Sequence, residues 1–476
     1  MPLDTAPGGP DQSETGDLST KTVLDRVEQL QRTLEGSYRD KIVEAIFADA
    51  EAIAHKVTQT NETASYHLDQ RIDRLVTSKI WGLPTMGLLL AVVFWVTIEG
   101  ANVPSAMLAD GLFWLGDQGA ALFTAIGLPW WVTGFIWDGI YRGLAWVIAV
   151  MLPPMAIFFP IFTILEDLGY LPRVAFNIDA LFKKAGAHGK QALTMSMGLG
   201  CNAAGVIACR IIDSPRERLI AILTNNFMPC NGRWPTLIML ATLFVAAAFP
   251  PVFAALAAAG SLVLIVVIGG AMTLLVSAIL SRTVLKGEAS SFTLELPPYR
   301  RPNMLRVLYT SLIDRTIFVL WRAIVMAVPA GGVIWLLSNI RVGGQNLTTH
   351  VATWLEPAGR AIGLDGTILL AYIIAIPANE IVVPTIIMAY TQAGMMVELD
   401  SLEQLRHLLV DQQGWTLMTA VSLMLFSLLH NPCSTTIWTV YQETRSVKWA
   451  AVSGLMPLAI AFVLLFALTQ IVRAIG

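Results

Sequence analysis

The sequence predicts an all-α polytopic membrane protein in which apolar helices follow a short soluble helical region. Three observations predict this class. Of the residues, 55% are hydrophobic and only 14% are charged, whereas about a quarter are charged in soluble domains. The mean hydropathy is +0.63. Apolar runs recur at the length of about 20 residues that crosses a bilayer, and we expect roughly eight to ten such segments.

The first 78 residues are polar and contain no short apolar core of a secretory signal. Residues 1–20 are rich in Gly, Pro, Ser, Thr and acids, so we expect a disordered tail. Residues 21–78 carry dense mixed charge with apolar residues at helical spacing. This pattern predicts a cytoplasmic helical region, which either docks a partner or forms a solvated arm.

Charge distinguishes the two sides of the membrane. Residues 99–138 contain acidic residues but no Lys or Arg, which predicts an external segment. Basic residues cluster in 171–190 and 282–307, and the positive-inside rule places both segments in the cytoplasm. Three tryptophans at the outer edge fit an aromatic belt: Trp130, Trp131 and Trp137.

The apolar part contains an internal repeat. Residues 147–165 resemble residues 323–340, and each stretch is followed by a Pro-Cys segment, at 227–240 and 429–441. The first copy begins with a span that runs inward and the second with one that runs outward, so we predict an inverted repeat. In transporters built this way, interrupted helices hold the substrate at mid-membrane. The predicted organisation is a first span and external segment at 79–143, a first repeat at 144–250, a span and cytoplasmic linker at 251–318, a second repeat at 319–441 and a C-terminal span at 442–476.

Helix-breaking residues interrupt several apolar segments next to a thiol. Glycines lie beside Cys201, and a proline precedes both Cys230 and Cys433. Carbonyls freed by such breaks are tolerated in a membrane only where they line a cavity. Glu380 is ionisable within an apolar span, which marks a site or pathway by default. Three thiols and a carboxylate suit a borderline divalent transition metal better than Mg²⁺ or Ca²⁺. We predict these four residues as metal ligands and Asn202 as a neutral oxygen ligand.

Structural explanations compete with these roles. A buried cysteine often packs as a small hydrophobe, and we expect this of Cys209, which lies outside any break. Glycines in membrane helices allow close helix contact. A structural Glu380 would pair with Arg233 or Asn202. Arg233 itself is expected to be a charge partner or to snorkel to an interface, and His430 is expected to cap a helix.

Other classes of site are disfavoured. Residues 186–191 superficially match a phosphate-binding loop, but Lys184 replaces the required glycine and Gln191 replaces the Ser or Thr that would hold Mg²⁺. The sequence therefore predicts a protein that is not an enzyme and binds no permanent cofactor. The four cysteines lie in apolar surroundings, which argues against a disulfide framework. The net charge of −3 gives no indication of a nucleic-acid partner.

At these motifs the chain resembles the membrane domain of the ferrous iron transport protein B (FeoB) family. The resemblance covers about 400 residues in the right order. It rests on segments at 71–90, 165–190, 198–202, 229–235, 295–308 and 431–433. The resemblance implies import of Fe²⁺ across the bacterial inner membrane through two related gate repeats. It also implies that Cys201, Cys230 and Cys433 take part in the passage of iron.

The sequence departs from the family pattern in several places. Members of the family carry an N-terminal GTPase domain, which a helical coupling bundle connects to the membrane domain. In this chain, only residues 21–78 resemble part of that region, namely the end of the bundle. The resemblance therefore implies a separately encoded GTPase partner at these residues. The usual Val-Pro-Ala after the Gly-Cys-Asn motif is replaced by residues 203–205, the usual Ala-Lys-Glu is Ala-Asn-Glu at 378–380, and His430 and Asn431 replace an aromatic-apolar pair.

These departures leave alternative functions. A divergent permease would carry another metal or a nucleoside-like solute, although the thiols at the breaks argue against an organic solute. A non-transporting membrane scaffold would show no flux, and a membrane metalloenzyme would require a histidine-rich cluster. A homo-oligomer is compatible with the sequence.

Overall fold

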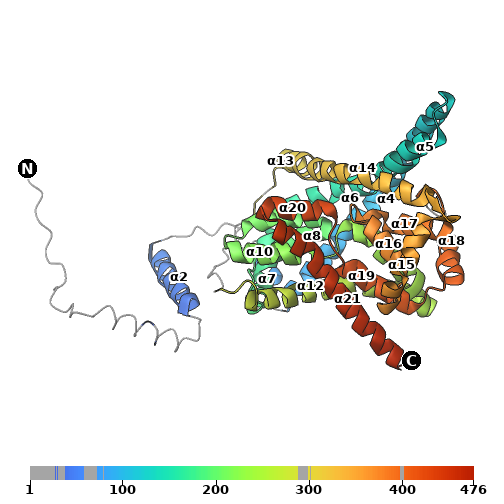
Figure 1. Cartoon of the computed structure of the whole chain (residues 1–476). Coiled ribbons are helices and arrows are strands. Elements are labelled where there is room, and N and C mark those ends of the chain that lie inside the picture. Colours follow the sequence, from blue (N-terminus) through green and yellow to red (C-terminus); the bar gives the residue numbers. More distant parts are fainter. Residues whose placement is uncertain are drawn as a thin grey trace, which may run out of the picture. The chain divides into compact units, whose positions relative to one another are not determined.

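The computed structural model describes residues 27, 29, 38–57, 72–78, 80–287, 299–300, 302–396 and 401–475. The predicted disordered tail at residues 1–20 lies outside the described residues. The chain divides into two compact units, residues 1–67 with 290–295 and residues 68–289 with 296–476. In the first unit, helix α2 (Tyr38–Val57) falls within the helical region predicted at 21–78 (Figure 1).

The second unit is built from long apolar helices. Within its described residues, six helical stretches are long and apolar enough to cross a membrane. A seventh span is counted if α15 (Leu347–Ala361) and α16 (Gly366–Ile374) together form one broken span, with a bend of 110° between them. The six stretches are formed by α4 (Gly82–Ala125), α5 (Trp130–Thr133) with α6 (Arg142–Asp167), α12 (Pro251–Arg282), α14 (Phe318–Asn339), α19 (Leu417–Leu429) with α20 (Ser434–Thr444), and α21 (Val447–Ile475). The predicted all-α polytopic fold is confirmed.

Shorter elements connect the long helices. The short α-helices are α7 (Tyr170–Lys184), α8 (Gln191–Gly200), α9 (Asn202–Ala208), α10 (Pro215–Thr224), α11 (Trp234–Leu240), α13 (Met304–Tyr309), α17 (Val382–Thr391) and α18 (Leu402–Arg406). Wider π-helical turns cover Gly134–Tyr141, Ala241–Val245, Thr310–Ile317 and His407–Gln412. Single 3-10 turns cover Cys209–Ile211, Asn225–Phe227, Asn231–Arg233, Ala246–Ala248 and Asn379–Ile381. Strands β1 (Arg341–Val342) and β2 (Gln345–Asn346) pair antiparallel.

The six membrane-spanning stretches are fewer than the eight to ten apolar segments expected from the sequence, because some of these segments are broken into short helices. Residues 191–212, 219–247 and 365–394 are three of the apolar segments that the sequence indicates, and each is divided into short helices. The first span also differs from the prediction, because α4 does not end near residue 98. It runs for 44 residues, about 66 Å at 1.5 Å per residue, or twice the roughly 30 Å of a hydrocarbon core. Acidic residues of the predicted external segment therefore lie on a helix.

The two halves of the second unit are interrupted in the same way. Between α8 and α9, Cys201 is extended, with φ −153° and ψ 123°. After α16, Ala378 has almost the same conformation, with φ −153° and ψ 118°. Cys230 and Cys433 are also extended and directly precede a helical turn, with φ −79°, ψ 168° and φ −62°, ψ 156°. The backbone thus pairs Cys201 with Ala378 and Cys230 with Cys433.

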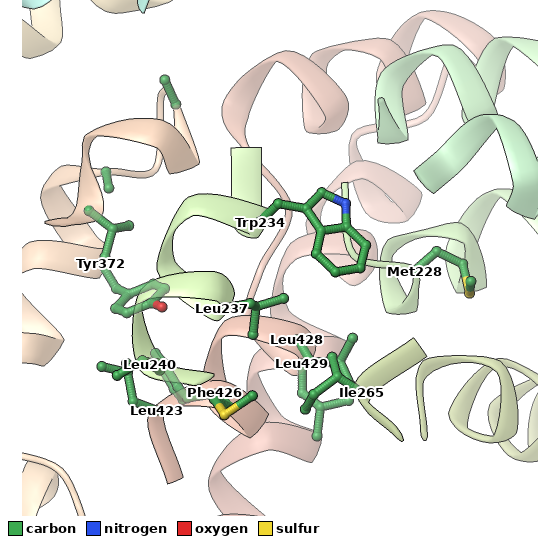
Figure 2. Packing of buried hydrophobic residues seen from close by; sticks show 14 of the residues in the cluster. Met228, Trp234, Leu237, Leu240, Ile265, Tyr372, Leu423, Phe426, Leu428 and Leu429 are labelled. Carbon is green, nitrogen blue, oxygen red and sulfur yellow. The ribbon is translucent and has the colours of Figure 1, made fainter. Parts of the chain in front are cut away.

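A common core packs the interrupted segments of both halves. Leu240 of α11 lies near Tyr372 of α16 and Phe426 of α19, whereas Trp234 at the start of α11 lies toward Met228 (Figure 2). Leu237 and Leu240 are fully buried. Burying a leucine side chain stabilises a fold by about 1.5–3 kcal/mol when the alternative is water, so this packing helps to hold the interrupted segments together.

The segments predicted to be cytoplasmic contact one another. Arg173 Nε lies 3.0 Å from Asp73 Oδ1, and the Tyr299 hydroxyl donates to the same oxygen at 2.8 Å. The Arg173 guanidinium also lies 4.3 Å from the centre of the Tyr299 ring. Three stretches far apart in the sequence therefore meet at one end of the unit, as a common side of the membrane requires.

We predict that Lys183 faces the cytoplasm and Asp117 the exterior. With cysteine introduced at either position, a membrane-impermeant maleimide added to intact cells should label Asp117→Cys. Lys183→Cys should be labelled only after the membrane is permeabilised. Both side chains are well exposed, at 44% and 71%, so access depends on the membrane alone. The unmodified chain gives the background, and labelling of Lys183→Cys in intact cells would contradict the topology.

Candidate metal site

The helix breaks of both halves meet at one small cavity of about 30 Å³. A single water needs about 10–15 Å³, so the cavity has room for one small ion or two waters. All five predicted ligand residues line it: Cys201, Asn202, Cys230, Glu380 and Cys433. The thioethers of Met151 and Met155 on α6 complete one wall. The structure therefore brings together residues that are up to 232 positions apart in the sequence.

The three thiols occupy equivalent local positions, each directly before a helical turn begins. Cys201 and Cys230 are each 8% exposed, and Cys433 is half-buried with its sulfur 3.2 Å from Thr436 Oγ1. Among the described residues, no three His, Cys, Asp or Glu side chains are grouped closely enough to hold a metal ion together. The predicted ligands share a cavity without forming a finished coordination shell.

Glu380 is buried without a cationic partner among the described residues. Its side chain is 9% exposed, and no Lys, Arg or His nitrogen in that part of the chain lies within 4.0 Å of its carboxylate. The carboxylate packs against Gly232, where an added Cβ would overlap Glu380 Oε1. The proposed structural pairing with Arg233 is therefore wrong. A buried, unpaired carboxylate costs several kcal/mol in an apolar setting, and a cation in the cavity would offset that cost.

Arg233 corrects another prediction, because it neither pairs with a carboxylate nor snorkels to an interface. Its side chain is 1% exposed, and its guanidinium binds backbone at two helix breaks. Nη1 donates to the carbonyls of Asn226 and Leu428, both at 2.8 Å. Nη2 donates to Asn226 Oδ1 at 3.0 Å and to the His430 carbonyl at 3.3 Å. Arg233 thus joins the break of the first half to that of the second.

The glycines beside Cys201 admit a polar side chain. A Cβ at Gly198 would lie 2.8 Å from the Asn225 amide, and one at Gly205 would lie 2.5 Å from it. Asn225 Nδ2 in turn donates to the Asn202 carbonyl at 3.0 Å. Close packing therefore explains these glycines, and the packing itself satisfies a carbonyl that the helix break leaves free.

Asn202 is engaged with the protein through its amide. The orientation that satisfies most groups lets Nδ2 donate to the Gly198 carbonyl at 3.0 Å and the Met228 carbonyl at 3.2 Å. The opposite orientation makes one bond, to Asn226 Oδ1 at 3.2 Å, and faces the amide oxygen toward both carbonyls. The first orientation makes two hydrogen bonds instead of one, and it leaves Asn202 Oδ1 3.2 Å from Asn226 Oδ1 with no hydrogen between them, because Asn226 Oδ1 accepts from Arg233 Nη2. Asn202 remains a predicted ligand.

Two structural predictions are confirmed. His430 caps α19, since its ring Nδ1 lies 2.8 Å from the Ser427 carbonyl in the last turn. Cys209 is fully buried in a separate hydrophobic cluster, where its thiol donates to the Gly205 carbonyl at 3.3 Å.

Sequence reasoning did not predict three polar residues of the cavity as ligands: Asn231, Asn379 and Thr435. Thr435 is buried, and its hydroxyl has no hydrogen-bond partner among the described residues. No sequence signal distinguished Thr435 from its threonine neighbours. Asn379 did have a signal, because it follows Ala378 as Asn202 follows Cys201 in the matched repeat.

The fold and the site define a class: a multi-pass α-helical membrane protein whose interrupted helices meet at a cavity lined by thiols and a carboxylate. Two family models match the chain. Gate, described as "Nucleoside recognition", matches residues 148–244 and 320–447. The model described as "Ferrous iron transport protein B C terminus" matches residues 262–314. Together these matches fall within the part of the chain that follows residue 147, and they show similarity to the membrane part of FeoB proteins.

Several curated relatives are similar over most of the chain. The chain is 28% identical to an Fe(2+) transporter FeoB of Staphylococcus aureus (strain MSSA476) over 447 residues, which cover 91% of the chain and 62% of the relative. It is 28% identical to an Fe(2+) transporter FeoB of Synechocystis sp. over 428 residues, 89% of the chain and 66% of the relative. A relative of the same name from Legionella pneumophila (strain Lens) is 28% identical over 80% of the chain and 50% of its own length. The chain thus spans less than two thirds of these relatives. No solved structure matches the chain.

We predict that Arg233→Met destabilises the protein far more than Arg210→Met. Loss of Arg233 leaves buried carbonyls at two breaks without a donor, at about 1–3 kcal/mol for each. Arg210 is a matched control because its ion pair with Glu443, at 2.7 Å, is formed by a side chain that is 66% exposed, and such pairs contribute about 0–1 kcal/mol. Thermal unfolding of the two purified variants in detergent measures the difference. Equal melting temperatures would refute the bridging role of Arg233.

Proposed function

We propose that this chain is a membrane permease for a divalent transition metal, with Fe²⁺ as the transported ion. The observation that supports this function is the lining of one cavity. Three cysteine thiols from both halves of the chain line it together with a buried carboxylate. Sulfur ligands favour transition metals over Mg²⁺ and Ca²⁺, which prefer shells of oxygen. The relatives are named as Fe(2+) transporters, and we extend that substrate to this chain.

The ligands are suited to transient binding. A conducted ion must bind well enough to enter and weakly enough to leave. In our proposal Cys201, Cys230 and Cys433 are successive soft ligands, Glu380 compensates charge and Asn202 offers a neutral oxygen. Because the ligands come from four separate helix breaks, small movements of one half against the other would change how many of them reach the ion at once.

The size of the cavity argues against an organic solute. The Gate model carries the description "Nucleoside recognition", which raises a nucleoside-like substrate as the alternative. Pockets for small organic ligands usually have about 300–1,000 Å³, whereas this cavity has about 30 Å³. A metal ion fits the cavity as it stands, and a nucleoside does not.

The cellular setting is part of the proposal. We place the protein in the bacterial inner membrane, with residues 21–78 as the docking region for a separate GTPase. The described part of that region includes α2, whose apolar side chains Ile42, Ile46 and Ile53 are exposed. Uptake assays run with and without a purified candidate GTPase would show whether such a partner increases the flux.

We predict that Glu380→Gln abolishes Fe²⁺ uptake while the protein remains folded. The substitution keeps the size of the side chain and removes the charge that would compensate the ion. Uptake is measured as quenching of an iron-sensitive dye inside proteoliposomes under anaerobic, reducing conditions. Glu99→Gln is the control, because Glu99 is exposed on α4 and its loss should leave uptake unchanged. Normal uptake by Glu380→Gln would assign Glu380 a structural role.

We further predict that Cys201→Ser lowers Fe²⁺ uptake at least about tenfold, the scale on which loss of a metal-binding group acts. Serine keeps nearly the same volume but offers a harder oxygen. Cys209→Ser is the matched control, because Cys209 is equally buried but lies in a different cluster; it should affect stability and not uptake. If both variants lose uptake to the same extent, the Cys201 thiol acts through packing and not as a ligand.

A further inference from the structure

Asn379 occupies the position in the second half that Asn202 occupies in the first. It begins the 3-10 turn Asn379–Ile381, directly after Ala378, whose backbone matches that of Cys201 to within 5° in φ and ψ. The side chain is 6% exposed and lines the cavity beside Glu380. Its amide lies between two groups, the ring of His430 and the thiol of Cys230.

The protons of His430 are fixed by the helix that it caps. Nδ1 faces two acceptors, the carbonyls of Ser427 at 2.8 Å and Phe426 at 3.2 Å, so it carries a hydrogen. The Arg233 guanidinium donates to the carbonyl of His430 itself, and the ring otherwise contacts the aromatic rings of Tyr372 and Phe426. A second buried positive charge beside that guanidinium would be unfavourable. The ring is therefore neutral, and Nε2 presents a lone pair.

This lone pair determines how the Asn379 amide is turned. The amide lies 3.2 Å from His430 Nε2, which can only accept, so the amide must present its NH₂ group there. The hydrogen-bond partners of an amide decide which of its ends is nitrogen and which is oxygen. The other end of the amide, 3.9 Å from Cys230 Sγ, is then the carbonyl oxygen, and it faces the thiol and the cavity.

We infer that Asn379 Oδ1 is a further ligand of the transported ion, held in place by His430 as a positioning residue. The inference rests on the proposed function. A sulfur and an oxygen that bind one ion tetrahedrally, at about 2.3 and 2.1 Å, lie roughly 3.6 Å apart. The separation of 3.9 Å between the amide and Cys230 Sγ is close to this value.

Co²⁺ is the probe for this inference, because its absorption bands report thiolate and oxygen ligands separately. The full chain is purified in detergent and titrated with Co²⁺ without oxygen. Asn379→Leu, which keeps the volume and removes the oxygen, should weaken binding at least tenfold and change the ligand-field bands while the thiolate charge-transfer band remains. Asn379→Asp, which keeps an oxygen toward Cys230, should bind at least as tightly as the unmodified chain. If the leucine variant fails to fold, Asn379→Ala replaces it.

His430 is tested by rescue. His430→Phe removes the acceptor and should weaken Co²⁺ binding, whereas His430→Gln supplies an acceptor oxygen for the amide and should restore it in part. Asn431→Ala is the matched control, since Asn431 lies next to His430 and bonds to the Pro432 carbonyl at 3.3 Å without lining the cavity; it should bind normally.

The outcomes separate this inference from the proposed function. If the unmodified chain neither binds Co²⁺ nor takes up Fe²⁺, the proposed function fails. If the unmodified chain binds Co²⁺ and Asn379→Leu binds it equally well with unchanged bands, the amide presents its NH₂ group to the cavity and only the ligand role of Asn379 is overturned.

Discussion

The interrupted helices depend on the bonds that Arg233 makes with backbone oxygens. A helix that stops inside an apolar medium leaves carbonyls without partners, and each one costs free energy that water cannot recover there. A guanidinium offers five donors in one plane, and Arg233 uses the four of Nη1 and Nη2 on oxygens of Asn226, Leu428 and His430. Because these oxygens belong to both halves of the chain, one side chain fixes the distance between the two Pro-Cys breaks and therefore between two of the thiols.

Asparagine side chains near the cavity also donate hydrogen bonds to backbone carbonyls at the helix breaks. Asn225 donates to the Asn202 carbonyl, and Asn226 donates to the His430 carbonyl at 2.9 Å. Backbone closes the remaining gap, since the Ser434 amide donates to the Ile376 carbonyl at 2.7 Å. Protein groups thus satisfy much of the broken backbone without using the cysteine sulfurs or the Glu380 carboxylate. These groups are left to face the cavity, which is the condition for any of them to meet an ion.

The sequence alone predicted the breaks and the residues of the cavity because glycine, proline, cysteine and glutamate are conspicuous in apolar segments. It could not predict what holds the breaks together. The contact between Arg233 and Leu428 joins residues 195 positions apart, and no local pattern indicates it. The end of α4 was also missed, since hydropathy falls at Glu99 although no helix stop follows, and Pro104 is tolerated within the helix. The role of Asn379 required the ring of His430, which is 51 positions away.

The two halves are equivalent in backbone but not in ligands, and this difference suits the proposed function. Cys230 and Cys433 correspond to each other, whereas Cys201 corresponds to Ala378. A fourth cysteine at 378 would complete a four-thiol set of the kind that binds structural zinc in a closed tetrahedral shell. Such a site would hold its ion too firmly for conduction. The second half instead presents the Glu380 carboxylate to the cavity, while its Asn379 corresponds to Asn202 of the first half. In the proposed function, replacing one soft ligand by a harder carboxylate would weaken the grip on a transition metal and still compensate its charge, and this broken symmetry of the ligands would allow the ion to leave.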